Sequence, residues 1–251
     1  MPEGLKSGYY TENNKIVHYS GFPATHFFVD EADVSTFKPI SNEYGKDKNH
    51  VYYGAKIINQ ADPATFEYLG GPYSRDKNTG FFQDKILSDD GSNFVVLPNV
   101  DNPTAISYAK DSRTVYKGNL IFEGADPASF EFIPMYNGNS LTHDKNNVYF
   151  NDLPVPDADG SQFKKVTGFY FKDNENAWAL LLGKDIAWVE IPDVDAPGFT
   201  GLKEYYAKDK NNVYYENKIV TGADLGTFEE LANGKAKDKN GNYSNGAFVK
   251  K

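Results

Sequence analysis

The chain has 251 residues, 15% of them aromatic, with 18 Tyr, 18 Phe and a formal net charge of −9. This charge argues against a nucleic-acid-binding surface, which needs a dense basic patch, and the absence of cysteine excludes disulfides and thiolate chemistry. No apolar run approaches the roughly 20 residues of a membrane span. Tyr and Phe suit pleated, half-buried surfaces, so the composition favours strands.

One aspartate motif recurs along the whole chain. The aspartates are spaced by 29 to 36 residues, and Glu12 occupies the same role 35 residues before the first of them. The residue before the aspartate is usually basic, the residue five places after it is aromatic in all seven copies, and a tyrosine stands three places before it in five copies. Such self-similarity is typical of a repeat architecture. The seven aspartates are Asp47, Asp76, Asp111, Asp144, Asp173, Asp209 and Asp238.

Each motif predicts a β-hairpin. A short strand such as Tyr206 to Lys208 leads into Asp-Lys-Asn-Asn, and the chain returns as Val213 to Val220. The Asp side chain accepts hydrogen bonds from backbone N–H groups two residues on, and Asn adopts a positive φ at low cost. A calcium loop would need several carboxylates converging on one ion, but Lys follows the Asp in five copies and places a positive charge there. Turn formation is therefore the favoured role, and no metal site is predicted.

A second motif, Ala-Asp-x-x-Ser/Thr-Phe, follows the hairpin. The segment Asp62 to Thr65 is typical of a single helical turn, because Asp caps free N–H groups and Pro63 occupies the first position. An aliphatic residue stands three places after each phenylalanine, as Leu69 does after Phe66. The two would share a face on a helical turn and lie on opposite faces of a strand, and the sequence leaves both open. In either case we expect the pair in the core.

The sequence therefore predicts an all-β fold with short helical turns, arranged as an open, solenoid-like stack of β-hairpin repeats with two or three strands each. Stacking buries aromatic faces that one hairpin cannot bury alone. A closed, propeller-like ring is the alternative, although a blade usually needs four strands in about 40 or more residues. We expect a single repeat domain over residues 1–251, with repeats opening near residues 8, 41, 72, 106, 140, 169 and 204 and a truncated cap from residue 235.

Two copies of the motif carry a family resemblance. The stretches Asp47-Lys48-Asn49-His50-Val51-Tyr52-Tyr53 and Asp209-Lys210-Asn211-Asn212-Val213-Tyr214-Tyr215 resemble the signature of the DKNYY repeat family of bacterial proteins. Through successive copies the resemblance covers nearly the whole chain. It implies a bacterial origin and no recognised enzymatic role, and it supplies no catalytic residues.

Two departures from the repeat are candidate partner-binding sites. The copy at Asp173 holds both tryptophans, Trp178 and Trp188, in apolar segments joined by Gly183-Lys184-Asp185, which predicts a longer hairpin. Tryptophan is favoured at interfaces, although a core position is the commoner one. In addition, the residue six places after the Asp is often aromatic, and it points away from the preceding aromatic. This aromatic stripe would be exposed, unless each sheet is buried on both faces, and it consists of Tyr53, Phe82, Phe150 and Tyr215.

The sequence predicts no catalytic, cofactor-binding or metal-ligating residues. The four histidines, His18, His26, His50 and His143, lack metal-ligand spacing, and the chain has no nucleophile elbow, phosphate loop or dinucleotide fingerprint. A hydrolase with paired carboxylates is a remote alternative, because most acidic residues recur at equivalent turn positions.

The leading hypothesis is a non-enzymatic protein-interaction repeat protein. In its most concrete form it is an immunity-like or inhibitory binder of a basic protein partner, because the chain is acidic. The alternative is a cell-surface or periplasmic glycan-binding module that uses the aromatic stripe. The polar start from Met1 to Asn14 does not resemble a signal peptide. The compartment stays open between the cytoplasm and, if an export signal has been removed, the periplasm or cell envelope.

Overall fold

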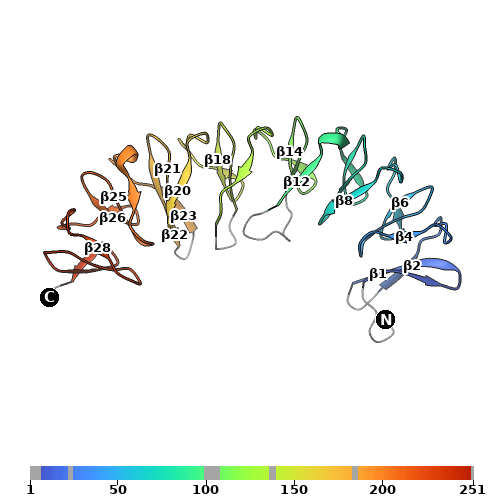
Figure 1. The fold of residues 1–251 in the computed structure, drawn as a ribbon, viewed down its shortest axis with the longest axis horizontal. Helices are drawn as coiled ribbons and strands as arrows, with labels where there is room; N and C mark the ends of the chain where they lie inside the picture. The colour runs from blue at the N-terminus through green and yellow to red at the C-terminus, as the bar shows by residue number, and fades with distance from the viewer. Residues whose placement is uncertain (1–6, 22–24, 99–107, 136–139, 183–185, 250–251) are drawn as a thin grey trace. The chain divides into compact units, whose positions relative to one another are not determined.

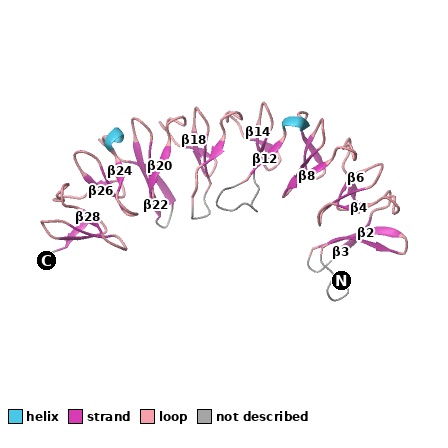
Figure 2. Ribbon diagram, in the orientation of Figure 1, coloured by secondary structure: helices cyan, strands magenta, loops and turns pink. Residues whose placement is uncertain are grey.

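The computed structural model describes residues 7–21, 25–98, 108–135, 140–182 and 186–249. Within these ranges the strands form one three-stranded and seven four-stranded antiparallel sheets. The helical segments in the same ranges are two short 3-10 turns, η1 (Gly91–Asn93) and η2 (Ala196–Gly198) (Figure 2). The prediction of an all-β repeat fold is thus confirmed. None of the described helices has the length and apolar character that a membrane span requires.

The chain divides into two compact units, residues 1–128 and residues 129–251, which we call the N-terminal and C-terminal halves. Each half contains four sheets that follow one another in chain order (Figure 1). The expectation of one repeat domain over the whole chain stays a prediction.

In the N-terminal half each sheet is formed by consecutive strands. The sheets are β1 (Gly8–Glu12) to β3 (Thr25–Phe28) with β2 (Lys15–Ser20) between them; β4 (Lys38–Pro39), β5 (Tyr44–Lys46), β6 (Val51–Tyr53) and β7 (Lys56–Ile57); β8 (Glu67–Gly70), β9 (Tyr73–Arg75), β10 (Gly80–Phe82) and β11 (Lys85–Ser88); and β12 (Val95–Leu97), β13 (Tyr108–Lys110), β14 (Val115–Lys117) and β15 (Leu120–Ile121).

The C-terminal half follows the same plan. Its sheets are β16 (Glu131–Phe132), β17 (Leu141–His143), β18 (Val148–Phe150) and β19 (Leu153–Pro154); β20 (Lys164–Thr167), β21 (Tyr170–Lys172), β22 (Ala177–Leu182) and β23 (Ile186–Glu190); β24 (Thr200–Gly201), β25 (Tyr206–Lys208), β26 (Val213–Tyr215) and β27 (Lys218–Ile219); and β28 (Glu229–Glu230), β29 (Lys235–Lys237), β30 (Asn242–Ser244) and β31 (Ala247–Val249).

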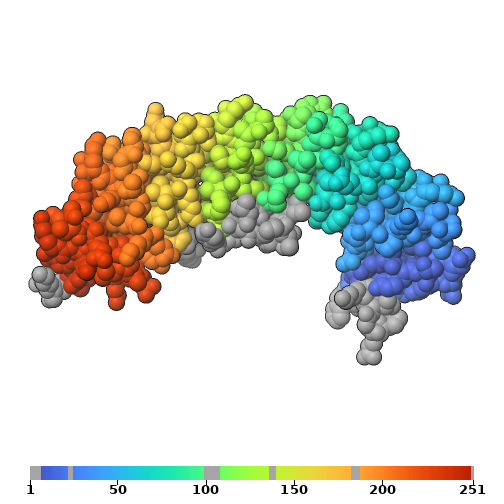
Figure 3. Space-filling model, in the orientation of Figure 1, coloured from blue at the N-terminus to red at the C-terminus, as the bar shows by residue number. Residues whose placement is uncertain are grey.

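Both faces of a central hairpin inside each half are buried, as β25 and β26 show. In the hairpin of β25 and β26, Tyr206 pairs with Tyr215 and Ala207 with Tyr214, so alternation places Tyr206 and Tyr214 on opposite faces. Both side chains are nevertheless buried, because one packs toward the following sheet and the other toward the preceding sheet. Side chains of successive sheets fill the space between them within each half (Figure 3).

The phenylalanine of the second motif is wedged between two sheets. The ring of Phe199 lies 5.7 Å from Tyr170 of the preceding sheet and 5.8 Å from Tyr214 of its own sheet. In the next interval Phe228 repeats this arrangement between Tyr206, at 5.2 Å, and Tyr243, at 5.3 Å. Aromatic pairs at these centroid distances add stabilisation to the apolar area that they bury.

The turn aspartate holds two motifs together. One carboxylate oxygen of Asp209 accepts hydrogen bonds from the N–H groups of Asn211 and Asn212, each at 2.7 Å. The other accepts from the N–H of Asp195 at 2.9 Å and from the hydroxyl of Tyr214 at 2.8 Å. The buried carboxylate therefore closes its own hairpin and fixes the second motif that begins 14 residues earlier. This confirms turn formation as the role of these residues.

The same pattern recurs in both halves. Asp47 and Asp238 make all four hydrogen bonds. Asp76 and Asp173 make the three backbone bonds, and the residue five places later, Phe or Trp, has no hydroxyl to offer.

Conserved chemistry around the aspartate links each repeat to its neighbours. The tyrosine three places before it donates its hydroxyl to the backbone of the next repeat, as Tyr44 does to the carbonyl of Pro72 at 2.7 Å. The basic residue directly before it donates to the next second motif, as Lys46 Nζ does to the carbonyl of Pro63 at 2.8 Å. The lysine directly after it pairs with the aspartate of its own second motif, at 3.1 Å from Lys210 to Asp195.

Three details of the repeat differ from the prediction. Each sheet after the first has four strands, where two or three were predicted. The outer strands could not be predicted because they are often only two residues long and show no alternation of apolar and polar residues. Each sheet after the first therefore begins before the predicted opening, as β24 does at Thr200 rather than near residue 204; the opening near residue 106 lies outside the described residues. The last sheet, β28 to β31, has all four strands where a truncated cap was predicted.

Two open or assumed points are also settled. Phe66, directly before β8, packs with the cluster around Tyr44, whereas Leu69 within β8 packs with the cluster around Tyr73, so the two side chains point to opposite sides of the sheet. The Glu12 copy does not build the aspartate turn. Its turn consists of Asn13 and Asn14, with φ of 48° and 58°, and the Glu12 carboxylate accepts the hydroxyl of Tyr19 at 2.7 Å.

Replacing Asp209 by alanine is expected to destabilise the fold by about 2–4 kcal/mol, because three part-buried N–H groups and the buried hydroxyl of Tyr214 lose their acceptor. Urea unfolding of the full chain, followed by circular dichroism, measures the change. The matched control is Lys210→Ala, which removes only the exposed ion pair with Asp195 and should change stability far less. Equal effects of the two substitutions would contradict the role given to Asp209.

The turn aspartates also predict loss of stability in acid. Burial alone would raise the pKa of Asp209, but the hydrogen bonds from Asp195, Asn211, Asn212 and Tyr214 outweigh it and lower the pKa. Since the folded pKa lies below the unfolded value of about 3.9, this stabilisation is present above pH ~4 and disappears as the pH falls further.

The pKa values of Asp47, Asp111 and Asp238 are lowered in the same way, because hydrogen bonds outweigh burial. We therefore expect the free energy of unfolding to decline steeply below about pH 4, with a shallower slope in Asp209→Asn. Urea titrations at a series of pH values test this, and an unchanged slope in the variant would count against it.

Candidate functional site

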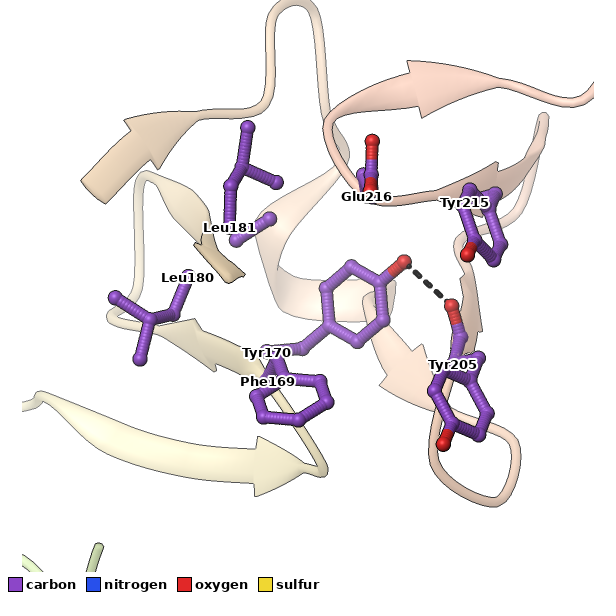
Figure 4. Close-up of a pocket in the computed structure, with 8 residues that line it drawn as sticks. Phe169, Tyr170, Leu180, Leu181, Tyr205, Tyr215 and Glu216 are labelled. Atoms are coloured by element: carbon purple, nitrogen blue, oxygen red, sulfur yellow. Dashed lines mark hydrogen bonds between the residues drawn. The ribbon is translucent and has the colours of Figure 1, made fainter. Parts of the chain in front are cut away.

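A pocket opens in the C-terminal half at the ends of the strands that lie away from the Asp209 turn (Figure 4). Its volume is about 260 Å³. The close-up shows Leu180 and Leu181 on one side of Tyr170 and the aromatic residues of the next repeat on the other. The lining consists of Phe169, Tyr170, Ala179, Leu180, Leu181, Tyr205, Tyr215 and Glu216.

One wall of the pocket exists because one hairpin is longer than the others. In most repeats the chain turns seven places after the aspartate, but in the Asp173 copy β22 continues to Leu182 and pairs with β23 over five residue pairs. Leu180 and Leu181 therefore extend to where other repeats have a turn. The predicted turn Gly183-Lys184-Asp185 lies outside the described residues, but the flanking strands confirm the longer hairpin.

The pocket floor is fixed by hydrogen bonds between repeats. Tyr170 is buried, and its hydroxyl donates to the carbonyl of Tyr205 at 3.0 Å. The loop before β25 is held by the buried carboxylate of Glu230, which accepts from the N–H groups of Lys203 and Tyr205 at 2.8 Å each. The aromatic wall at Tyr205 is thus positioned by a carboxylate from the following sheet.

Glu216 occupies an unusual backbone position for its residue type. Its φ is 55°, in the left-handed region that favours Gly and Asn. The equivalent turn positions, seven places after the aspartate, have φ between 47° and 58° and are occupied mostly by Gly and Asn. They are Gly54, Gln83, Gly118, Asn151 and Asn245. Residues kept in strained conformations often have a functional reason, so Glu216 is the most informative side chain of the pocket.

In each half the fourth strands carry exposed apolar side chains nine or ten places after the turn aspartate, including Leu120 at 68% and Leu153 at 71% exposure. In the last sheet Val249, eleven places after Asp238, is exposed as well. We call this set the edge row. It comprises Ile86, Leu120 and Ile121 in the N-terminal half and Leu153, Ile219, Phe248 and Val249 in the C-terminal half.

The opposite edge of the sheets differs in chemistry. The first strands begin with exposed, mostly charged or polar residues; they are Lys38, Glu67, Val95, Glu131, Lys164, Thr200 and Glu229. Some of these pair with the neighbouring strand, at 2.9 Å from Glu67 to Arg75 and 3.1 Å from Glu229 to Lys237. Charges on an edge strand prevent unwanted strand pairing. The fourth strands also carry exposed lysines, Lys56, Lys85 and Lys218, so the two edges differ mainly in the number of exposed apolar side chains.

The acidity of the chain lies largely inside the scaffold. Among the described residues seven acidic side chains are buried, six of them turn aspartates and the seventh Glu230. Without them the sequence has 28 acidic against 26 basic side chains, compared with 35 against 26 in total. The formal charge of −9 therefore gives little information about an acidic outer surface. In the described ranges, no three His, Asp or Glu side chains are grouped as a metal site would require.

A model of the DKNYY family matches residues 5–85 and 108–247. The chain belongs to the DKNYY family. The resemblance read from the two motif copies is thus confirmed. No curated protein and no solved structure matches the chain.

In this DKNYY protein the residues of the aromatic stripe are half-buried between sheets. Tyr53 packs against Tyr44 at 5.1 Å and Phe82 against Tyr73 at 5.4 Å. Phe150 packs against Trp188 at 5.5 Å. The first two contacts lie within one sheet, whereas Trp188 belongs to the next sheet and covers Phe150. A binding role for these four residues stays a prediction.

Tyr215 is the stripe residue that the structure places in the pocket; it also packs against Tyr206 at 5.1 Å. The tryptophans of the DKNYY protein lie elsewhere. Trp178 is buried in the core beside Phe163, so its side chain is not available to a partner. Trp188 is half-buried, and its Nε1 has no hydrogen-bond acceptor in the described part of the chain.

Sequence reasoning missed Phe169, Tyr205, Glu216 and the edge row. The aromatic residues four places before the aspartate, Phe169 and Tyr205, occur in two consecutive copies of the DKNYY protein. Glu216 stands where most other copies have Gly or Asn. Both signals are departures from the repeat. The sequence does not show, however, that Phe169, Tyr205 and Glu216 line the same pocket.

Glu216→Asn is expected to stabilise the protein by about 0.5–1 kcal/mol, because Asn tolerates this backbone conformation better than Glu. The matched control is Gln83→Asn at the equivalent turn, where φ is 56°. Thermal and urea unfolding measure both changes. If Glu216→Asn destabilises the protein while Gln83→Asn stabilises it, the Glu216 side chain stabilises the fold, and the prediction is wrong.

Proposed function

We propose that this DKNYY protein is a non-enzymatic binding protein that docks a protein partner along the edge row. The observation that supports this most directly is the contrast between the two edges of the sheets. One edge carries charged and polar side chains, and the other exposes apolar side chains such as Leu153 and Ile219 at equivalent positions. Exposed apolar patches rimmed by polar residues mark interaction surfaces in soluble proteins.

The edge row suits side-chain docking better than strand addition. The fourth strands are often only two residues long, as in β19 and β27, so they offer few backbone groups to an added strand. The side chains instead project from rigid, stacked sheets. A partner that covers the row would bury apolar area with little loss of conformational entropy in this protein.

A non-enzymatic role is supported by the use of the carboxylates. The oxygens of the turn aspartates already accept hydrogen bonds from backbone N–H groups and tyrosine hydroxyls, which leaves them unsuited to proton transfer. The near balance of the remaining charges weakens the argument for a strongly basic partner, so the immunity-like version stays a prediction. The glycan alternative also stays a prediction, and its stripe residues are partly covered by neighbouring rings.

Photo-crosslinking at the two opposite edges of a sheet tests the proposal. A photoreactive phenylalanine analogue placed at Leu153 and, separately, at Ile219 should give covalent adducts with a partner in the cells that make the protein. The controls place the same analogue at Glu131 and Thr200, on the opposite edges of the same two sheets, and should give none.

Adducts at both edges, or at neither, would contradict docking through the edge row. Adducts with a second copy of the chain would make the row a self-association surface and overturn the assignment to a different partner. Once a partner is captured, the double change Leu153→Lys and Ile219→Lys should weaken its binding by about tenfold or more, whereas Glu131→Lys with Thr200→Lys should not.

A further inference from the structure

The pocket at Glu216 combines aromatic rings, aliphatic side chains and one carboxylate in a small volume. We propose that it binds a single lysine or arginine side chain from an exposed segment of the protein partner. This inference rests on the proposed function for the identity of the ligand, but the chemistry of the pocket is argued from its own residues.

The aromatic residues supply attraction for a cation. Phe169 and Tyr205 lie with their ring centroids 6.4 Å apart, and Tyr215 also lines the pocket. The face of an aromatic ring carries negative potential and attracts an ammonium or guanidinium group within about 6 Å of its centroid. Leu180 and Leu181 offer the apolar contact that the aliphatic stem of such a side chain needs.

The charge of the pocket has one sign. Glu216 is the charged residue of the lining. Burial raises the pKa of Tyr170, and the nearby carboxylates of Glu216 and Glu230 raise it further. Burial also raises the pKa of Tyr215, with Glu216 contributing in the same direction. The phenols therefore stay neutral near physiological pH, and the carboxylates leave a negative potential that favours a cation.

The size of the pocket limits its ligand. Pockets for drug-sized molecules and cofactors hold about 300–1,000 Å³, and this one holds about 260 Å³. One long side chain fits that space better than a cofactor does. A neutral apolar side chain would fill the aromatic part equally well but would leave the Glu216 carboxylate without a counter-charge.

The backbone of Glu216 supplies an independent argument. A residue other than Gly or Asn at φ 55° lowers the stability of the turn. Any benefit of the Glu216 carboxylate must therefore come from a role outside the turn. The corresponding groove of the N-terminal half, lined by Glu43, Tyr53, Lys56 and Asp84 among others, has its own cation: Lys56 Nζ lies 3.7 Å from Asp84. Among the described residues, the lining at Glu216 contains no lysine or arginine, so we assign the cation to a partner.

Methyl NMR of the purified full chain tests the pocket directly. The probe is N-acetyl-lysine N-methylamide, titrated at constant ionic strength, and the matched neutral probe is N-acetyl-norleucine N-methylamide. We expect the methyl signals of Leu181 to shift with the lysine probe and to shift much less with the norleucine probe.

Glu216→Gln is the decisive variant, because Gln83 already occupies the same backbone conformation at φ 56° and the substitution should fold normally. It should weaken binding of the lysine probe by about tenfold, the loss expected for one charge-assisted contact. Gln83→Asn, in the other half, should leave binding unchanged.

Equal shifts with both probes, undiminished binding in Glu216→Gln, or no shift at Leu181 would each overturn the proposal. These results are separate from docking along the edge row. If photo-crosslinking at Ile219 persists in Glu216→Gln while the lysine probe fails to bind the native protein, the edge row stands and the cation pocket falls.

Discussion

The fold depends on the turn aspartate of each repeat after the first, and in six of these seven repeats its carboxylate is buried. Burying a charge is costly unless hydrogen bonds replace its hydration, and the turn aspartate meets this condition with up to four donors. Two donors belong to its own turn, one belongs to the second motif 14 residues earlier, and one is the tyrosine that packs on the phenylalanine of that motif. The carboxylate thereby converts two weak local elements, a short hairpin and a capped turn, into one rigid repeat.

Once the repeats are rigid, stacking follows from the pattern of aromatic residues. Each hairpin presents a large ring on both faces, and the phenylalanine of the second motif fills the interval between neighbouring sheets, as Phe228 does between Tyr206 and Tyr243. The tyrosine hydroxyls and the basic residues beside the aspartates satisfy backbone carbonyls of the next repeat. Most of the side chains that recur in every repeat make contacts inside the scaffold, so few of them are free to contact a partner.

We therefore propose that function lies where the scaffold leaves side chains free, at the edges of the sheets and the ends of the strands. The edge row and the Glu216 pocket are such places, and they arise differently. The edge row follows the repeat and suits an extended partner surface. The pocket breaks the repeat through the long hairpin of β22 and β23, two neighbouring aromatic residues and a glutamate in a left-handed turn. In the proposed function the edge row supplies most of the affinity for the partner, and the Glu216 pocket supplies selectivity.

The sequence by itself determined the repeat, the hairpin at each aspartate, the all-β class and the family, because these depend on local turn chemistry and on spacing that survives in every copy. It also indicated the long hairpin around Trp178. Only the tertiary structure decided the four-stranded sheets, since two-residue strands such as β27 have no periodicity to read. It also decided that the aromatic stripe is largely covered, that most of the net charge is buried, and that Phe169, Tyr205 and Glu216 converge. These three residues meet because of the way one repeat packs on the next, and no single motif determines that packing.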